Sequence, residues 1–185
     1  MQRELILRAK EGDHEAFAAL AGEAFDRLYR TARLILRRED LAADAVQEAL
    51  VSAWLHIRAV REPERFEGWL YKVLIHACYR QARRDRSRSL TEIHLEPLGS
   101  PPAVLDASGP TANRDQLERA LKRLPAQQRA VLVVHYYLGM TESQAAAVLG
   151  IPIGTFKSRL SRATKAVRIA VEADLPVPTL KESVI

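Results

Sequence analysis

Apolar side chains recur every three or four residues along most of the chain, which is the period of an α-helix. No segment alternates apolar and polar residues as a strand does, so the predicted fold class is all-α. Asp13 is a predicted N-cap for the first long helix. The predicted helices cover residues 13–36, 41–58, 68–86, 117–124, 125–138, 141–149 and 153–168.

Residues 89–113 differ from their flanks, because they hold four of the nine prolines, three acids and no Lys or Arg. This composition is typical of an extended linker. We therefore predict two small helical domains joined by a flexible acidic linker. The predicted segments are an N-terminal helical bundle (residues 1–88), the linker (89–113), a four-helix domain with a helix-turn-helix (114–172) and a tail (173–185).

Composition excludes several classes of protein. The single cysteine, Cys78, rules out an intrachain disulfide and a thiolate metal cluster. No run of 18 apolar residues indicates a membrane span, and the polar start predicts no signal peptide, so we expect a cytoplasmic protein. The net charge of +5 includes 22 arginines and hides two basic clusters: residues 80–88 hold five arginines and one acid, and residues 157–168 hold five cations and no acid. Arginine is favoured where phosphates or base edges are bound.

The last predicted helix has one buried stripe, Phe156, Leu160, Ala163 and Val167, opposite a basic face. No acid occurs from residue 151 to 171, and a tight turn at Gly150 precedes the helix. This pattern indicates a helix that enters the major groove of DNA. The alternative is a solvated basic face. The candidate DNA-binding residues are Thr155, Lys157, Ser158, Arg159, Ser161, Arg162 and Lys165.

The helix predicted over residues 68–86 carries an outer ridge of aromatic and basic residues, four and three positions apart. Cations for the phosphates and rings for unstacked bases are what single-stranded DNA requires. Phe66, just before the helix, is a candidate wall for an extruded base. The alternative is that Trp69 and Tyr79 pack beside an ordinary charged face. The candidates are Phe66, Trp69, Lys72, His76, Tyr79, Arg80 and Arg83, with Arg86 at the end of the ridge.

A third face belongs to the helix predicted over residues 41–58. Asp44 and Glu48 are like charges one turn apart, which slightly destabilises a helix. With Gln47, Val51 and Leu55 they form an acidic and apolar stripe suited to a basic helical partner. The alternative is packing within the same domain.

These three faces, in this order, resemble the extracytoplasmic-function (ECF) group of bacterial sigma factors in the sigma-70 family. ILRAKEGDHEAFAAL resembles the opening helix, ADAVQEALVSAW the segment that binds the polymerase clamp helices, and FEGWLYKVLIHACYRQARR the segment that melts and reads the -10 element. ALKRLPAQQRAVLVVHYYLGMTESQAAAVLGIPIGTFKSRLSRA is similar to the -35-reading domain.

The resemblance implies contacts to core RNA polymerase (clamp helices and flap), promoter DNA and an anti-sigma factor, without catalysis, metal or cofactor. It implies polymerase contacts for Asp44, Gln47 and Glu48, beside Val51 and Leu55, and DNA contacts for the candidates on the other two faces. Leu41, His76 and Ser161 depart from the common family pattern. The acidic linker is expected to mimic nucleic acid in a basic polymerase channel.

Two alternatives remain open at this point. A repressor or activator with a helix-turn-helix and a dimerisation domain would bind a palindromic duplex tightly as the free protein. A nuclease would use Asp40, Asp44 and Glu48, although Asp40 lies about 40° from the other two around the helix.

Overall fold

The structure, a computed structural model, describes residues 2–92 and 110–173, with side chains from 2–88 and 116–173. The elements of these residues are all helical, which confirms the predicted all-α class. The α-helices are α1 (Gln2–Glu11), α2 (His14–Leu36), α3 (Glu39–His56), α4 (Phe66–Glu92), α5 (Pro110–Arg123), α6 (Ala126–Leu132), α7 (Glu142–Leu149) and α8 (Ile153–Ala173). Shorter turns are η1 (Ile57–Ala59), η2 (Pro63–Arg65) and η3 (Val133–Tyr137).

The first domain begins with α1 and α2, which are separate helices because Gly12 turns the chain at φ 103°. Asp13 is the N-cap of α2, as predicted, and its carboxylate accepts a hydrogen bond from the backbone N–H of Ala16 at 3.0 Å. The hydrogen bond from Ala16, followed by the hydrogen bond and ion pair with Arg8, holds the pKa of Asp13 below its usual value. The cap therefore stays charged at neutral pH and stabilises the start of α2.

Helices α3 and α4 pack closely because the inner face of α3 is built from small side chains. Ala42, Ala45, Ala49 and Ala53 are completely buried there. Without long side chains between them, two helices can approach to a short interaxial distance. The apolar period of residues 41–58 predicts an inner face of Ala42, Val46, Ala49, Leu50, Ala53 and Ile57, and all of these are buried except Leu50, which is half-buried. Helix α3 starts two residues earlier than predicted, at Glu39.

The second domain contains α5 to α8. The pattern Thr141-Glu142-Ser143-Gln144 predicts a capping box, and Thr141 and Gln144 form it at the start of α7. Gly150 ends α7 in the left-handed conformation, φ 67°, so the chain turns at once into α8. The predicted helix over 125–138 is instead α6 followed by the one-turn π-helix η3, and Pro125 is the residue before α6 rather than in its first turn.

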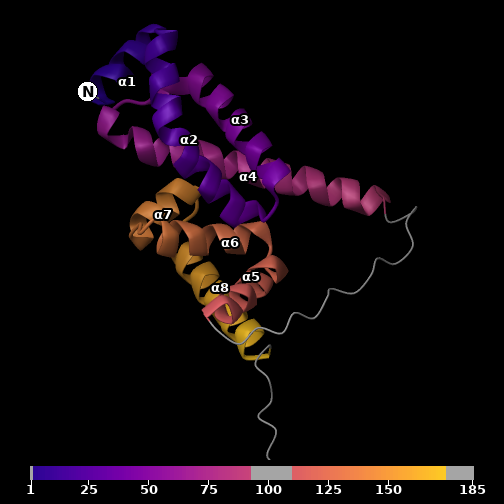
Figure 1. Ribbon diagram of the computed structural model, residues 1–185. Helices are drawn as coiled ribbons and strands as arrows, with labels where there is room; N and C mark the ends of the chain where they lie inside the picture. Colours follow the sequence, from indigo (N-terminus) through magenta and orange to yellow (C-terminus); the bar gives the residue numbers. More distant parts are fainter. Residues whose placement is uncertain (1, 93–109, 174–185) are drawn as a thin grey trace, which may run out of the picture.

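The two domains pack against each other and share one hydrophobic core. In Figure 1, α6 and α7 lie beneath α2 and α4, while the far end of α4 extends beyond the second domain. The structure lengthens α4 and α8 past their predicted ends at 86 and 168. Helix α5 begins at Pro110, inside the predicted linker. Most of that linker, 93–109, and the tail from 174 lie outside the described residues.

Candidate nucleic-acid interface

The basic face of α8 is exposed as the sequence predicts. Phe156 and Ala163 are completely buried and fix the rotation of the helix about its axis. Five of the seven candidates, Lys157, Ser158, Ser161, Arg162 and Lys165, are exposed, whereas Thr155 and Arg159 are half-buried. The Arg162 Nε donates to the Ser158 carbonyl at 3.2 Å, and Lys157 pairs with Glu142 of α7 at 3.1 Å. The face presents cations and hydroxyl groups on one rigid element.

The outer ridge of α4 is a second surface of the same kind, defined here as Trp69, Lys72, His76, Tyr79, Arg83 and Arg86. Lys72, His76, Arg83 and Arg86 are exposed, and Trp69 and Tyr79 are half-buried. Burial raises the pKa of Tyr79 to about 12, although the nearby positive charge of Arg159 acts to lower it. Burial, then Lys72 and Arg80, lower the pKa of His76.

Phe66 requires a correction, because its side chain is only 4% exposed. It is the first residue of α4 rather than part of an open loop, and it belongs to the core of the first domain. Its ring lies 5.9 Å from the ring of Trp69, centroid to centroid. Phe66 therefore packs in the core beside Trp69 and does not line an open pocket for an extruded base.

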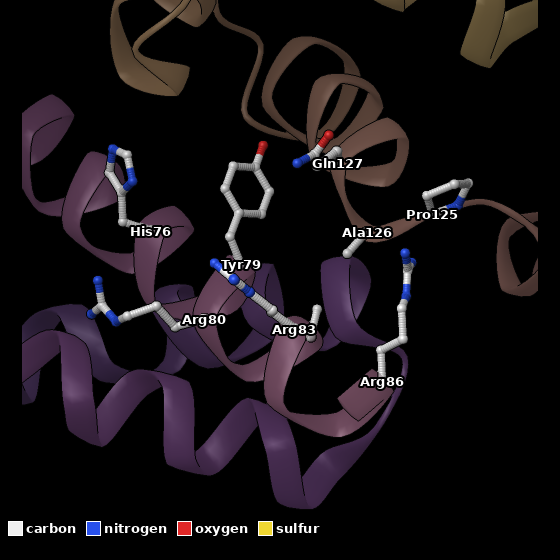
Figure 2. A pocket seen from close by; sticks show the side chains of 9 residues that line it. His76, Tyr79, Arg80, Arg83, Arg86, Pro125, Ala126 and Gln127 are labelled. Carbon is white, nitrogen blue, oxygen red and sulfur yellow. The ribbon is translucent and has the colours of Figure 1, made fainter. Parts of the chain in front are cut away.

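The α4 ridge faces the second domain. A cavity of about 460 Å³ lies between them, lined by His76, Tyr79 and Arg83 on one side and Pro125, Ala126 and Gln127 on the other. Figure 2 shows Tyr79 rising from α4 towards the helix that carries Gln127, with Arg86 opposite Pro125 and Ala126.

The predicted acidic and apolar stripe on α3 divides into two parts. Asp44 and Gln47 are exposed, and Val51 and Leu55 are 55% and 68% exposed. Glu48 instead turns towards α4, where its carboxylate accepts hydrogen bonds from Arg80 at 2.6 Å, Gln81 at 3.1 Å and Arg84 at 3.3 Å. Two exposed apolar side chains beside Asp44 and Gln47 form a surface suited to a protein partner.

The residues proposed for the nuclease alternative do not form a metal site. Asp40 pairs with Arg38, which together with backbone hydrogen bonding lowers its pKa, and Glu48 pairs with Arg80. Among the described residues, no group of three or more His, Cys, Asp or Glu side chains is placed to hold a metal ion. Cys78 is completely buried, and burial raises its pKa to about 12, so its thiol is unreactive.

Sequence reasoning missed two arginines, Arg129 and Arg84, whose side chains connect different helices. Arg129 of α6 is buried and donates to the carbonyls of Leu124 at 2.6 Å, Leu121 at 3.3 Å and Ile35. Arg84 shares the carboxylate of Glu48. In the sequence, Arg129 could have been noticed as a single charged residue directly before the apolar run of residues 130–134.

No helix among the described residues is long and apolar enough to cross a membrane.

Comparison with known proteins agrees with this geometry. Residues 21–88 match the family description "Sigma-70 region 2", and residues 114–167 match "Sigma-70, region 4". The chain is 32% identical over 160 residues to the ECF RNA polymerase sigma factor SigM of Mycobacterium tuberculosis, covering 86% of this chain and 79% of that protein. It is 32% identical over 169 residues to SigL of the same species, covering 87% and 94%.

A solved structure has the same fold. It is the sigma factor RpoE in complex with the anti-sigma factor NepR from Bartonella quintana, with a TM-score of 0.63 and 26% identity over 86% of this chain and 98% of that chain.

The fold and the two basic surfaces thus define a promoter-recognising protein that directs transcription initiation and is not an enzyme. The chain belongs to the ECF RNA polymerase sigma factors of the sigma-70 family.

Proposed function

We propose that the two domains divide promoter recognition between them, and that strand opening is driven by binding energy. The α8 face binds the -35 element as duplex. The α4 ridge, with Arg80, captures the unstacked non-template bases of the -10 element. The single observation that carries this proposal is the pair of basic surfaces, one on each domain, of which only the α4 ridge interleaves cations with aromatic rings.

Docking on core RNA polymerase is assigned to α3. Asp44, Gln47, Val51 and Leu55 give an exposed acidic and apolar surface, which suits the clamp helices. Glu48 contributes there through the edge of its carboxylate, which remains 27% exposed. In this proposal residues 1–88 serve docking and the -10 element, residues 114–172 serve the -35 element and the polymerase flap, and residues 89–113 link them.

The chain is proposed to act in the cytoplasm under the control of an anti-sigma factor. The support is that the related RpoE is described in complex with the anti-sigma factor NepR. The position of residues 89–113 between the domains supports their passage through a basic polymerase channel, where three acids and no Lys or Arg would mimic nucleic acid.

The decisive experiment is reconstitution of the full chain with core RNA polymerase and a promoter library. A specific transcript is expected only when both are present, with little binding of the free protein to duplex DNA. No complex with core polymerase and no specific start would refute the proposal. Tight binding of the free chain to a palindromic duplex would favour a repressor instead.

Two variants separate the assigned surfaces in that assay. Asp44→Arg should weaken binding to core polymerase without changing the unfolding midpoint, because Asp44 is exposed. Arg162→Ala should weaken recognition of preferred -35 sequences by about 1–3 kcal/mol if the guanidinium binds a base edge. A uniform loss on all sequences would reassign Arg162 to a phosphate, and unchanged polymerase affinity of Asp44→Arg would remove α3 as the docking face.

A further inference from the structure

A separate basic cavity of about 450 Å³ lies where the end of α2 meets α5 and η3. A cavity of this size suits one small molecule, since ligand sites usually measure about 300–1,000 Å³. None of its lining residues is among the candidates for contact with DNA or with core polymerase. The contacts proposed above therefore leave this cavity without an assigned role.

Cations outnumber carboxylates in the lining of the cavity by four to two. The two carboxylates already form ion pairs, with Arg33 at 2.8 Å and with Arg37 at 3.1 Å. The other two cations, Arg30 and Lys122, form no ion pair or hydrogen bond among the described residues. The cavity therefore keeps two positive charges, one from each domain, that no described group neutralises.

The arginines of the cavity are arranged as phosphate ligands. Arg30, Arg33 and Arg37 are three and four residues apart, so they lie on one face of α2. The Arg33 guanidinium lies 6.0 Å from the centroid of the Tyr29 ring, which limits its freedom. Guanidinium groups hold phosphate oxygens through parallel hydrogen bonds, and Lys122 of α5 adds a further cation. A row of this kind suits several linked phosphates.

Arg37 has a backbone conformation that arginine does not favour. It ends α2 in the left-handed region, with φ 61° and ψ 18°, where glycine is the usual residue. Its Nε is buried without a hydrogen-bond partner among the described residues. Burial, then Arg37, lower the pKa of Arg129, so the two guanidinium groups repel each other. Strain of this kind gathers at functional sites, and an anion in the cavity offsets the repulsion.

The cavity also has an aromatic side. Tyr137 lines it and is 49% exposed, beside the half-buried Leu34. Tyr137 is the last residue of η3, the one-turn π-helix, and such turns are frequent at functional sites. An exposed tyrosine ring offers a face on which a planar base stacks. The cavity thus combines cations for phosphates with a ring for a base.

We propose that this cavity is a binding site for a nucleoside polyphosphate, whose phosphates are held by Arg30, Arg37 and Lys122 and whose base stacks on Tyr137. The site shares no residue with the two DNA surfaces, so it does not rest on the function proposed for them. Its ligand binds the folded chain only, because α2 and α5 supply the cations together, and it therefore stabilises that chain.

Isothermal titration calorimetry of the full chain, without divalent cations, tests the two parts of the ligand. The probes are ATP, tripolyphosphate, which has the same chain of phosphates without a ring, and adenosine, which has the ring without phosphates. ATP should bind most tightly, tripolyphosphate more weakly, and adenosine not detectably. Tyr137→Leu should bring the affinity for ATP down to that for tripolyphosphate and leave the latter unchanged.

A pair of double variants tests the cations. Arg30→Gln/Lys122→Gln should weaken the binding of ATP and of tripolyphosphate by at least about tenfold each, because two charge-assisted contacts are lost. Both residues are exposed, so the thermal unfolding midpoint without ligand should not change. The matched control, Arg61→Gln/Arg168→Gln, removes one exposed arginine from each domain outside the cavity and should bind as the parent does.

Other outcomes would overturn the inference. They are no binding of ATP, or equal losses in the two double variants, which would assign the binding to overall positive charge. Equal affinities of the parent for ATP and tripolyphosphate would exclude a nucleoside. Binding of a random single-stranded DNA 12-mer that falls by the same factor in Arg30→Gln/Lys122→Gln would assign these cations to a nucleic-acid backbone. Transcription with core polymerase tests the proposed function separately, so the two can fail independently.

Discussion

At the scale of single residues, Arg129 is the one charged side chain among the buried polar residues of the described structure. It is 9% exposed, and its guanidinium donates to the carbonyls of Leu121, in the last turn of α5, of Leu124, directly after α5, and of Ile35, near the end of α2. Helix C-termini carry partial negative charge, so one cation stabilises two of them at once. Burial, then Arg37, lower its pKa, yet an arginine stays charged at any ordinary pH.

Replacing this guanidinium should therefore destabilise the protein strongly. Arg129→Met is expected to lower the free energy of unfolding by about 3 kcal/mol, because it leaves buried carbonyls without donors. The measurement is urea unfolding followed by circular dichroism. Arg168→Met, on the exposed face of α8, is the matched control and should change stability by less than about 0.5 kcal/mol. Equal losses in the two variants would contradict this assignment.

The Glu48 carboxylate should couple α3 to α4 energetically. Its side chain is 27% exposed and that of Arg80 45% exposed, so solvent screens the pair in part. A double-mutant cycle of Glu48→Gln and Arg80→Gln is expected to give a coupling energy of about 0.5–1 kcal/mol in urea unfolding. A cycle in which Asp44→Asn, on the outer face of α3, takes the place of Glu48→Gln should give no coupling energy. Coupling of equal size for Asp44 would show that Glu48 has no special role.

At the scale of helices, the sequence predicts the buried face well for a helix that packs against the rest of the protein on one side only. The α3 stripe of Ala42, Val46, Ala49 and Ala53 is buried as predicted. For α4 the sequence predicts an inner stripe of Leu70, Val73, Leu74, Ala77 and Gln81, but Tyr71 and Ile75 are buried outside it and Val73 is only half-buried. Periodicity identifies the apolar face of a helix packed on one side. Because α4 packs on α2 and α3 and also faces α6 and α7, its buried sector is wider than one stripe.

The capping box of α7 was predictable because its signal is entirely local. Thr141 accepts from the Gln144 N–H at 3.3 Å, and Gln144 accepts from the Thr141 N–H at 3.0 Å. Thr141→Ala should lower the free energy of unfolding by about 1 kcal/mol. Chemical denaturation measures this loss, and Thr164→Ala, inside α8, is the control expected to change little. If Thr141→Ala unfolds at the same denaturant concentration as the parent, the box contributes nothing to stability.

At the scale of the whole molecule, the sequence correctly indicates two helical halves but not their packing. Interdomain contacts come from residues whose local patterns are ordinary, such as Arg129, Ala126 and Gly150. The residues across the interface from them, Ile35, Arg83 and His76, lie more than forty residues away along the chain. No period or spacing encodes such a pairing. The candidate DNA residues were found from one helix face at a time, whereas the packing of α4 against α6 and α7 becomes visible only with both halves in place.

The packing of the two domains should respond to pH through His76. The ring lies beside Gly150, near Lys72 and Arg80 of its own helix, with the Tyr79 ring at 6.4 Å. Burial lowers its pKa below the usual 6.5, so a form with the domains apart, in which the imidazole has an ordinary pKa, binds the proton first as the pH falls. The contribution of His76 to domain packing is therefore fully present above about pH 6.5 and is lost as the pH falls through the lowered pKa.

Small-angle X-ray scattering of the full chain measures this response. The radius of gyration should rise as the pH falls from about 7.5 to about 5.5, across the range where histidine titrates. His76→Asn removes only this titrating group and keeps the other four histidines, so its radius should be nearly constant over the same range. Tyr79, with its pKa raised to about 12, does not titrate there. An equal rise in His76→Asn would assign the opening to other groups, since only a response that disappears with the imidazole reports protonation at the contact between α4 and the turn at Gly150.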